Sequence, residues 1–318
     1  MRIGRREILM GAAVTLFAPP AWAATISLGG PAFGSYWRCL VPAGTDRAAL
    51  MAETTGLIAG LDAELSPWRD DSALTALNRA PAGRWMQMGD ATRTCLREAE
   101  AVQRLTGGGF DARVGPLVAR YGFGQIAGEV TRAGRFELSG GAVRKSHDAL
   151  TFDPCGLAKG HALDLLAQRI AGLGARDALV EIGGEVRTLG RHPSGRPWRV
   201  AIEAPGAELP QAQRVVRPGP LALATSAHAP QGHAGPATTS HVIDPVSARP
   251  AAQGLLQVSV LARTGLRADA LATGLLALGP ERGAALARRA GIAALFLHRA
   301  SEGAVEMMTG GIDAHFIA

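Results

Sequence analysis

Hydrophobic residues recur with helical spacing in four stretches of the chain. Residues 46–65 place Leu50, Leu57, Ile58, Leu61 and Leu65 on one face, which predicts an amphipathic helix. Ser66-Pro67 ends it. The pattern predicts three more helices: residues 91–105, ended by the glycines from Gly107; residues 158–173, ended by Gly174; and residues 266–278, ended by Gly279-Pro280.

Shorter apolar runs lie between these helices. They predict strands over residues 149–153, 178–182, 198–202, 256–262 and 292–298. Residues 206–220 are polar and contain proline, which predicts an irregular connection. Helices and strands are interspersed without strict βαβ alternation, so we expect an α+β fold rather than a doubly wound parallel sheet. No low-complexity linker divides residues 24–318, which favours one compact domain.

The N-terminal residues have the pattern of an export signal. Arg5-Arg6 stands directly before a short apolar stretch, residues 8–17, and Ala21-Trp22-Ala23 resembles a cleavage site. We therefore expect residues 1–23 to be a signal peptide and the mature protein to be periplasmic. The paired arginines predict the twin-arginine route. An ordinary secretory signal with two incidental arginines is the alternative.

Composition narrows the class of protein. Of 318 residues, 47% are hydrophobic and 19% are charged, which is the balance of a globular protein and excludes general disorder. The net charge of +6 comes from scattered residues, without the basic runs of a nucleic-acid-binding protein. Cys39, Cys95 and Cys155 form no CxxC pair, so we expect reduced thiols and at most one disulfide.

Lysine is rare in this arginine-rich chain, and only Lys145 and Lys159 are lysines. Lys159 follows Asp153-Pro154-Cys155-Gly156 at the start of a predicted helix. Helix N-termini favour anions, and an ammonium adds a point charge there, so this segment predicts a phosphate site. The alternative is a turn in which Asp153 only caps the helix. Lys145 lies in the polar stretch Arg144-Lys145-Ser146-His147, which predicts a turn in which substitution of Lys145 by Arg has no effect.

Two further segments carry groups suited to chemistry. Asp269 and Thr273 stand four residues apart on one helix face, and both offer the oxygen ligands that Mg²⁺ and Ca²⁺ prefer. The alternative is an exposed Asp in the first turn of a helix. His241, within residues 240–245, is a candidate general base. The alternative is an ordinary loop histidine.

A glycine-rich segment precedes two aromatic residues. Gly108-Gly109-Phe110-Asp111 is followed by Tyr121-Gly122-Phe123, and small residues beside aromatic rings suit a planar ligand lying against the backbone. A glycine turn with core aromatics is the alternative.

Taken in order, the segments of the chain resemble the ApbE family of FAD:protein FMN transferases, and the resemblance covers nearly the whole mature chain. The matching pieces are Phe33-Gly34-Ser35, Leu65-Ser66-Pro67-Trp68, residues 71–78, Gly109-Phe110-Asp111 through Pro116, residues 153–160, residues 180–184, residues 197–200, Thr225-Ser226, residues 241–245 and Ala268-Asp269-Ala270.

The resemblance implies a single compact α+β domain, T-fold-like, of mixed sheets flanked by helices. It implies Mg²⁺-dependent transfer of FMN from FAD to a Thr or Ser hydroxyl of a client protein, with release of AMP. The client would face the periplasm, as a respiratory membrane subunit does. Residues that would contact FAD are Phe33, Trp68, Gly109, Phe110, Asp111, Asp153, Lys159 and Ile243. Asp269, Thr273 and a backbone oxygen at Gly156 would hold the metal, and His241 would be the base.

The chain departs from the family pattern at a few positions. Phe33 stands where Met is usual, and Ala227 and Ala248 stand where Gly is frequent. Ala272 lacks a side-chain oxygen that some members have. Two other functions stay open: an Mg²⁺-dependent FAD pyrophosphatase that releases FMN and AMP to water, and a non-catalytic periplasmic flavin-binding protein.

Overall fold

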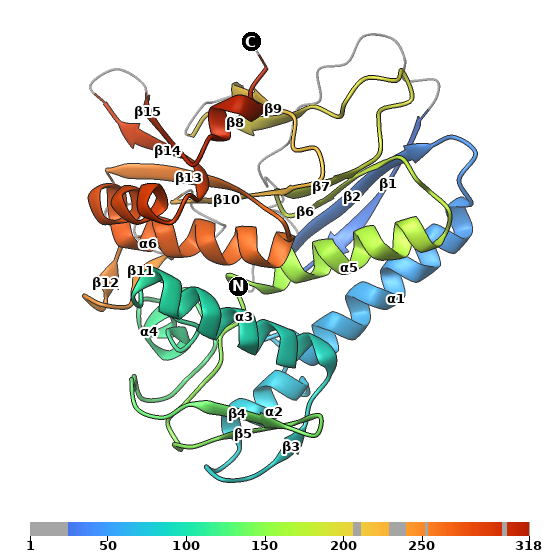
Figure 1. Ribbon diagram of the computed structural model, residues 1–318. Helices are drawn as coiled ribbons and strands as arrows, with labels where there is room; N and C mark the ends of the chain where they lie inside the picture. Colours follow the sequence, from blue (N-terminus) through green and yellow to red (C-terminus); the bar gives the residue numbers. More distant parts are fainter. Residues whose placement is uncertain (1–24, 206–210, 229–239, 252–253, 301–303, 318) are drawn as a thin grey trace, which may run out of the picture.

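An antiparallel sheet of eight strands forms the centre of the molecule (Figure 1). The computed structural model describes residues 25–205, 211–228, 240–251, 254–300 and 304–317, so the predicted signal peptide lies outside the described residues. All neighbouring strands of this sheet are antiparallel. In spatial order they are β1 (Thr25–Ala32), β2 (Ser35–Pro42), β6 (Ala178–Ile182), β7 (Glu185–Leu189), β10 (Ala222–Ala227), β13 (Leu255–Ala262), β14 (Ala293–Arg299) and β15 (Ala304–Thr309).

Both faces of the sheet are covered. Helices α1 (Arg47–Leu65), α5 (Ala158–Gly172) and α6 (Gly265–Arg289) lie under one face, and the hairpin of β8 (Val200–Glu203) and β9 (Ala212–Val216) lies over the other with the 3₁₀ helix Ile312–His315 (Figure 1). Along β6, Val180 belongs to the core between the sheet and the helices, and Leu179 belongs to the core between the sheet and the hairpin. Because successive residues of β6 point into one core or the other, all five of them are buried.

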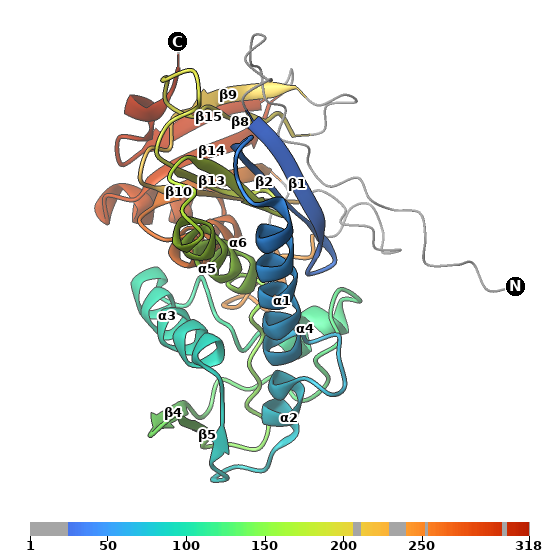
Figure 2. The ribbon, with the colours of Figure 1, turned by 90° about the vertical axis from the view of Figure 1, so that its right-hand side faces the viewer.

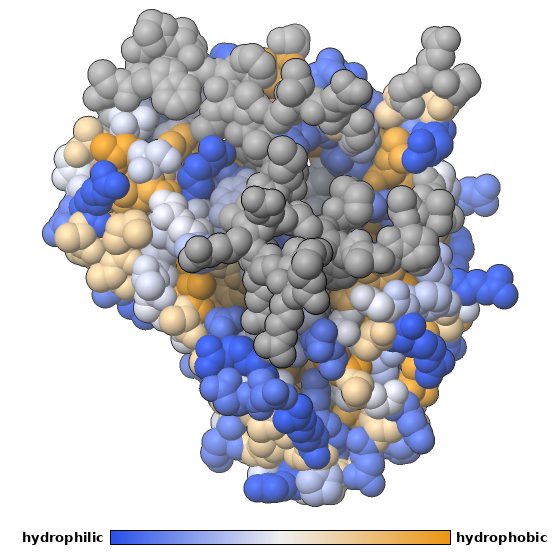
Figure 3. Space-filling model, turned by 180° about the vertical axis from the view of Figure 1, so that it is seen from behind, coloured by the Kyte–Doolittle hydropathy of each residue, from blue (hydrophilic) through white to orange (hydrophobic). Residues whose placement is uncertain are grey.

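A second group of elements lies on the far side of the helices from the sheet (Figures 1 and 2). We call residues 73–145 the lower lobe. It contains α2 (Ala73–Arg79), β3 (Met86–Gln87), α3 (Asp90–Thr106), α4 (Gly115–Arg120), β4 (Phe136–Ser139) and β5 (Ala142–Lys145). Polar and charged residues gather over the bottom of the molecule on its reverse side (Figure 3). The short pair β11 (Ile243–Asp244) and β12 (Arg249–Pro250) completes the fold.

The predicted helices are confirmed, with one correction. Asp46 caps α1 by accepting a hydrogen bond from the Ala49 N–H at 3.0 Å, and Gly107 ends α3 in the left-handed conformation. The helix predicted over residues 266–278 does end at Gly279, whose φ of 77° is not helical. A second helical segment, which the prediction lacks, follows this kink and runs to Arg289. Proline is tolerated there because it opens the second helical segment, where its missing N–H breaks no bond.

One strand prediction and one loop prediction are wrong. Residues 149–153 form no strand, because the side chain of Asn78 takes the place of a neighbouring strand: it donates to the Phe152 carbonyl at 2.9 Å and accepts from the Phe152 N–H at 2.7 Å. The connection predicted over residues 206–220 contains β9, which pairs with β8. The α+β prediction itself is confirmed. No described helix is long and apolar enough to cross a membrane.

Candidate functional site

Two glycines bring helices α5 and α6 into direct contact. A side chain at Gly160 would collide with the carbonyl oxygen of Gly265, so only glycine allows this approach. The approach lets an Asp269 carboxylate oxygen accept a hydrogen bond from the Gly160 N–H at 3.1 Å. Asp269 is 3% exposed. It is therefore not an exposed capping residue of α6, a role that Thr264 fills by accepting from the Arg267 N–H at 3.2 Å.

One helical turn further along α6, Thr273 meets the turn that precedes α5. A Cβ atom at Gly156 would lie 3.1 Å from the Thr273 Oγ1 and 3.1 Å from the Phe110 ring. The Thr273 Oγ1 is also 3.1 Å from the Ser226 Oγ of β10. The structure thus brings the three predicted metal ligands, Gly156, Asp269 and Thr273, to one place, and it adds Ser226.

The oxygen atoms gathered there suit a hard cation. Mg²⁺ prefers carboxylate, hydroxyl, carbonyl and water oxygens, which are the donors that Asp269, Thr273 and the Gly156 backbone offer. Within the ranges given above, no three His, Cys, Asp or Glu side chains could together hold a metal ion. A metal at this place would therefore have to use the hydroxyl and backbone oxygens beside Asp269. The residues present fit a magnesium ion of that kind.

Lys159 lies at the same helix start and is engaged by a carboxylate that sequence analysis missed. Its Nζ donates to the Glu185 Oε1 at 2.6 Å, and the Glu185 side chain is 1% exposed. Burial lowers the pKa of Lys159, but Glu185 and Asp269 outweigh burial and hold that pKa above its ordinary value. Glu185 follows Gly183-Gly184, and a Cβ at Gly183 would lie 3.1 Å from the Lys159 stem.

Asp153 forms the turn that leads into α5 rather than the cap of that helix. Its carboxylate accepts from the Cys155 N–H at 3.0 Å, while α5 begins at Ala158 without a side-chain cap. The Asp153 N–H donates to the Ala112 carbonyl at 2.7 Å, which ties the turn to the Gly109–Asp111 segment. Burial raises the pKa of Asp153, and its hydrogen bonds from Cys155 oppose that rise.

The glycine-rich segment lies against α6. A side chain at Gly109 would collide with Leu278, and Phe110 is buried where a Cβ at Gly274 would lie 2.9 Å from it. Asp111 is held by Arg113, whose Nε and Nη2 donate to it at 2.8 and 2.6 Å. Phe110 therefore borders both Gly156 and α6.

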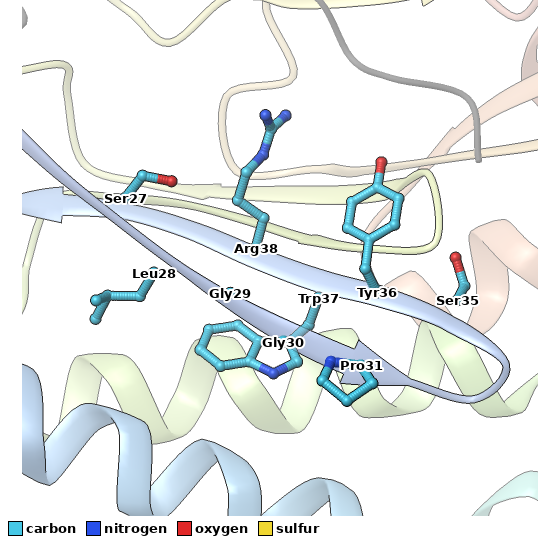
Figure 4. Close-up of a pocket in the computed structure, with 9 residues that line it drawn as sticks. All are labelled: Ser27, Leu28, Gly29, Gly30, Pro31, Ser35, Tyr36, Trp37 and Arg38. Atoms are coloured by element: carbon cyan, nitrogen blue, oxygen red, sulfur yellow. The ribbon is translucent and has the colours of Figure 1, made fainter. Parts of the chain in front are cut away.

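The turn between β1 and β2 lies near the same end of the sheet. Phe33 has a positive φ of 50° in this turn, and a Cβ at Gly183 would lie 3.4 Å from the Ser35 Oγ. A hollow of about 580 Å³ runs along the hairpin. Tyr36 and Arg38 point to one side of the hairpin and Trp37 to the other (Figure 4). The residues that line the hollow are Ser27, Leu28, Gly29, Gly30, Pro31, Ser35, Tyr36, Trp37 and Arg38.

Three predicted site residues lie on other segments. Trp68 follows α1 and is 57% exposed, whereas Ile243 is buried in β11. His241 is half-buried, and its ring lies edge-to-face against the Phe123 ring with centroids 6.3 Å apart. Residues 229–239, just before His241, lie outside the described ranges. The placement of these three beside FAD stays a prediction.

The prediction that Lys145 lies in a polar turn is wrong. This residue ends β5 and is 1% exposed. Its Nζ donates to the backbone carbonyls of Asn78, Asp148 and Leu150 at 2.7, 2.8 and 3.2 Å. Burial lowers its pKa. The strand alternation that turns Lys145 inward is hidden in the sequence by its polar neighbours Arg144 and Ser146.

Comparisons with known proteins show which family the chain resembles in sequence and in fold. A sequence model of the ApbE family matches residues 33–296. A protein of Klebsiella pneumoniae named FAD:protein FMN transferase is 33% identical over 328 aligned positions, which cover 94% of this chain and 93% of the relative. The solved structure of the flavin transferase ApbE from Vibrio cholerae has a TM-score of 0.80 at 30% identity, covering 92% of this chain and 99% of that one. The flavinyl transferase ApbE of Pseudomonas stutzeri, in its apo form, has a TM-score of 0.80 at 33% identity, covering 92% and 97%.

Proposed function

The chain belongs to the ApbE family, and from this membership and the site geometry we propose that it is an FAD:protein FMN transferase. The reaction moves FMN from FAD to a Thr or Ser hydroxyl of a client protein and releases AMP. The observation that carries the proposal is the convergence of Gly156, Asp269 and Thr273 beside Lys159, where α5 begins. That place combines cation ligands with an ammonium, as a pyrophosphate requires.

The positive groups at the start of α5 bind and orient the pyrophosphate of FAD. The N-terminus of a helix favours anions, and the Lys159 ammonium adds a full charge there. Mg²⁺ held by Asp269, Thr273 and the Gly156 backbone oxygen supplies further positive charge to the phosphoryl oxygens when it is bound. Fixed charges of this kind stabilise the negative charge that builds up on the leaving phosphate.

His241 is the proposed general base. The client hydroxyl attacks the phosphorus of the FMN half, and an imidazole nitrogen of His241 takes the hydroxyl proton. A phosphoester bond forms to the client, the bridging P–O bond of the pyrophosphate breaks, and AMP departs with that oxygen. The edge-to-face contact with Phe123 is suited to holding the imidazole in one orientation.

The remaining predicted contacts would position the flavin. Gly109 and Phe110 present backbone and an aromatic ring beside Gly156. Asp111 follows Phe110 directly, and Asp153 belongs to the turn that is hydrogen-bonded to this segment at Ala112. Phe33 and Trp68 offer apolar side chains from two other segments, and Ile243 lies buried in β11. These roles follow from the family and from the surroundings of each residue.

We also propose that the protein works in the periplasm on a client that exposes its Thr or Ser there, such as a subunit of a membrane respiratory complex. The support is the N-terminal pattern around Arg5-Arg6. Replacing both arginines by lysine should leave uncleaved precursor in the cytoplasm, which cell fractionation measures. Normal export of that variant would eliminate the twin-arginine route.

Mass spectrometry of co-expressed candidate clients tests the transferase proposal. The expected result is the added mass of FMN on a Thr or Ser of the client, present with the wild-type protein and absent without it. A protein that consumes FAD and leaves every client unmodified would favour the pyrophosphatase alternative instead.

A further inference from the structure

A buried carboxylate oxygen beside Lys159 lacks a hydrogen-bond partner. Glu185 uses Oε1 to accept from the Lys159 ammonium at 2.6 Å. Its Oε2 is buried and has no hydrogen-bond partner among the described residues. An ionised carboxylate is costly to bury when one of its oxygens is unpaired. Glu185 in its charged form therefore depends on Lys159.

Lys159 has more than one negatively charged neighbour. Lys159 from α5 and Asp269 from α6 both act on Glu185, Lys159 favouring its charged form and Asp269 disfavouring it. Arg187, two residues further along the same side of β7, is paired with Asp164. Without a bound metal, one ammonium thus balances the two buried carboxylates of Glu185 and Asp269 before any substrate binds.

A bound pyrophosphate would add negative charge at this ammonium. Without a bound metal, two carboxylates and a diphosphate cannot all stay ionised around one ammonium without a large electrostatic cost. Mg²⁺ at Asp269 would offset the charge of that carboxylate and leave Glu185 dependent on Lys159. Protonating one carboxylate removes that cost. Glu185 is the group best placed to take the proton, because Asp269 keeps the Gly160 N–H as a partner and Glu185 has an unpaired oxygen.

We propose that Glu185 holds the Lys159 ammonium in the free protein and takes up a proton from solvent when the pyrophosphate of FAD draws that ammonium away. This inference rests on the proposed function, since it assumes that FAD binds at Lys159. The step is a protonation only: the Glu185 carboxylate becomes a carboxylic acid, and Lys159 remains an ammonium throughout. Glu185 is thus a positioning residue whose charge changes with substrate binding.

The electrostatics of the pair agree with this step. Burial raises the pKa of Glu185 above its ordinary value, and the Lys159 ammonium works against that rise. Moving the ammonium toward the substrate weakens the opposing effect, so the Glu185 pKa rises further on binding. Proton uptake on binding means that FAD affinity falls as the pH rises, wherever Glu185 is ionised in the free protein.

Calorimetric titration of FAD into the full chain tests the proposal, first without and then with Mg²⁺. Repeating the titration in buffers of different ionisation enthalpy counts the protons exchanged. At pH values above the Glu185 pKa of about 8, where this group is ionised in the free protein, the wild-type protein should take up about one proton, and its affinity should fall about tenfold per pH unit. Glu185→Gln keeps the shape of the side chain but cannot be protonated in this way, so it should bind FAD with no uptake and little pH dependence.

Glu203→Gln is the matched control. Glu203 also has a buried oxygen without a partner in the described part of the chain, and burial raises its pKa, but it belongs to the hairpin on the opposite face of the sheet. This variant should take up the same proton as the wild type. Loss of proton uptake in Glu203→Gln together with its retention in Glu185→Gln would mean that Glu203 takes up the proton, and it would overturn the inference.

The outcomes separate this inference from the function on which it rests. A folded wild-type protein that does not bind FAD contradicts the proposed function. Binding without proton uptake, or full uptake in Glu185→Gln, contradicts the role of Glu185 alone. If Glu185→Gln does not fold, Glu185→Asp decides: it keeps an ionisable group at a changed distance, so the pH at which affinity changes should shift, and an unchanged pH would overturn the inference.

Discussion

Two described residues other than glycine adopt a positive φ, Phe33 at 50° and Ala248 at 57°. A side chain in this left-handed region costs about 1–2 kcal/mol, a cost that glycine avoids. Ala248 follows β11, accepts a hydrogen bond from the Tyr121 hydroxyl at 3.2 Å, and stands where the family often has glycine. Ala248 therefore adopts, at a cost, a backbone conformation that glycine would adopt freely.

Ala248→Gly should stabilise the protein by about 0.5–1 kcal/mol, since relief of strain exceeds the added flexibility of the unfolded chain. Urea unfolding at equilibrium measures this. Ala133→Gly is the control, because Ala133 is exposed and is not among the residues with positive φ. It should be neutral or slightly destabilising. A stability loss in Ala248→Gly as large as that in the control would contradict the strain argument.

Asp269 is the residue on which metal binding depends most in this account. Asp269→Asn can still accept from the Gly160 N–H but has no charge, so FMN transfer should collapse at ordinary Mg²⁺ concentrations while the fold persists. Asp269→Ala should lose transfer and also about 1–3 kcal/mol of stability, since a buried hydrogen bond is removed. Transfer assays across a Mg²⁺ titration check both. Near-normal transfer by folded Asp269→Asn would remove the metal assignment.

At the scale of elements, a few side chains position the turn that opens the site. Asn78 from α2 and Lys145 from β5 bind the backbone of residues 148–152 where no neighbouring strand does. Asp164 from α5 accepts from the N–H groups of Gly265 and Leu266, at 2.8 and 3.1 Å, and so joins α5 to the first turn of α6. These contacts place Asp153 and Asp269 relative to each other.

Lys145→Met should therefore destabilise the protein by about 3 kcal/mol, because three buried carbonyls lose their shared donor. Lys145→Arg should also destabilise, since a planar guanidinium cannot replace a compact ammonium there. The control is Arg144→Met in the same strand, whose partner Glu137 it meets near the surface, and its cost should stay below about 1 kcal/mol. Thermal unfolding measures all three, and an unaffected Lys145→Met would show that the carbonyls find other partners.

Elements with strong local signals were predictable from the sequence. The helices α1, α3 and α5 combine apolar spacing with a capping residue or a terminal glycine, and their predicted bounds agree with the structure within two residues. The hairpin of β1 and β2 carries no such signal, because Gly29, Gly30 and Pro31 interrupt its alternation. The kink at Gly279 is local, but the helix after it packs on the sheet, which no local pattern indicates.

The site was predictable only in part, for a related reason. Asp269, Thr273 and Gly156 belong to recognisable segments, and the close approach of α5 and α6 unites them. Glu185 was missed because its partner Lys159 lies elsewhere in the chain, and Lys145 was misplaced because one of its three partners, the Asn78 carbonyl, also does. Lys159 precedes Glu185 by 26 residues, and Lys145 binds a carbonyl 67 residues away. Such pairings depend on tertiary structure rather than on spacing.

At the scale of the whole molecule, the candidate site lies where three layers meet. The strands β7 and β10 contribute Glu185 and Ser226, the helices contribute Lys159, Asp269 and Thr273, and the lower lobe contributes Phe110 (Figures 1 and 2). Because both faces of the sheet are covered by packed residues, the site has a rigid support on the sheet side. A rigid frame suits a reaction that depends on fixed charges.

The central claim is that this site transfers FMN to a protein rather than to water. The most direct measurement is the ratio of FMN attached to a client to AMP released, with purified protein, FAD, Mg²⁺ and a client that carries an accessible Thr or Ser. The account predicts a ratio close to one, and no AMP above background when Asp269→Asn replaces the wild type. AMP released with free FMN and no modified client would contradict it.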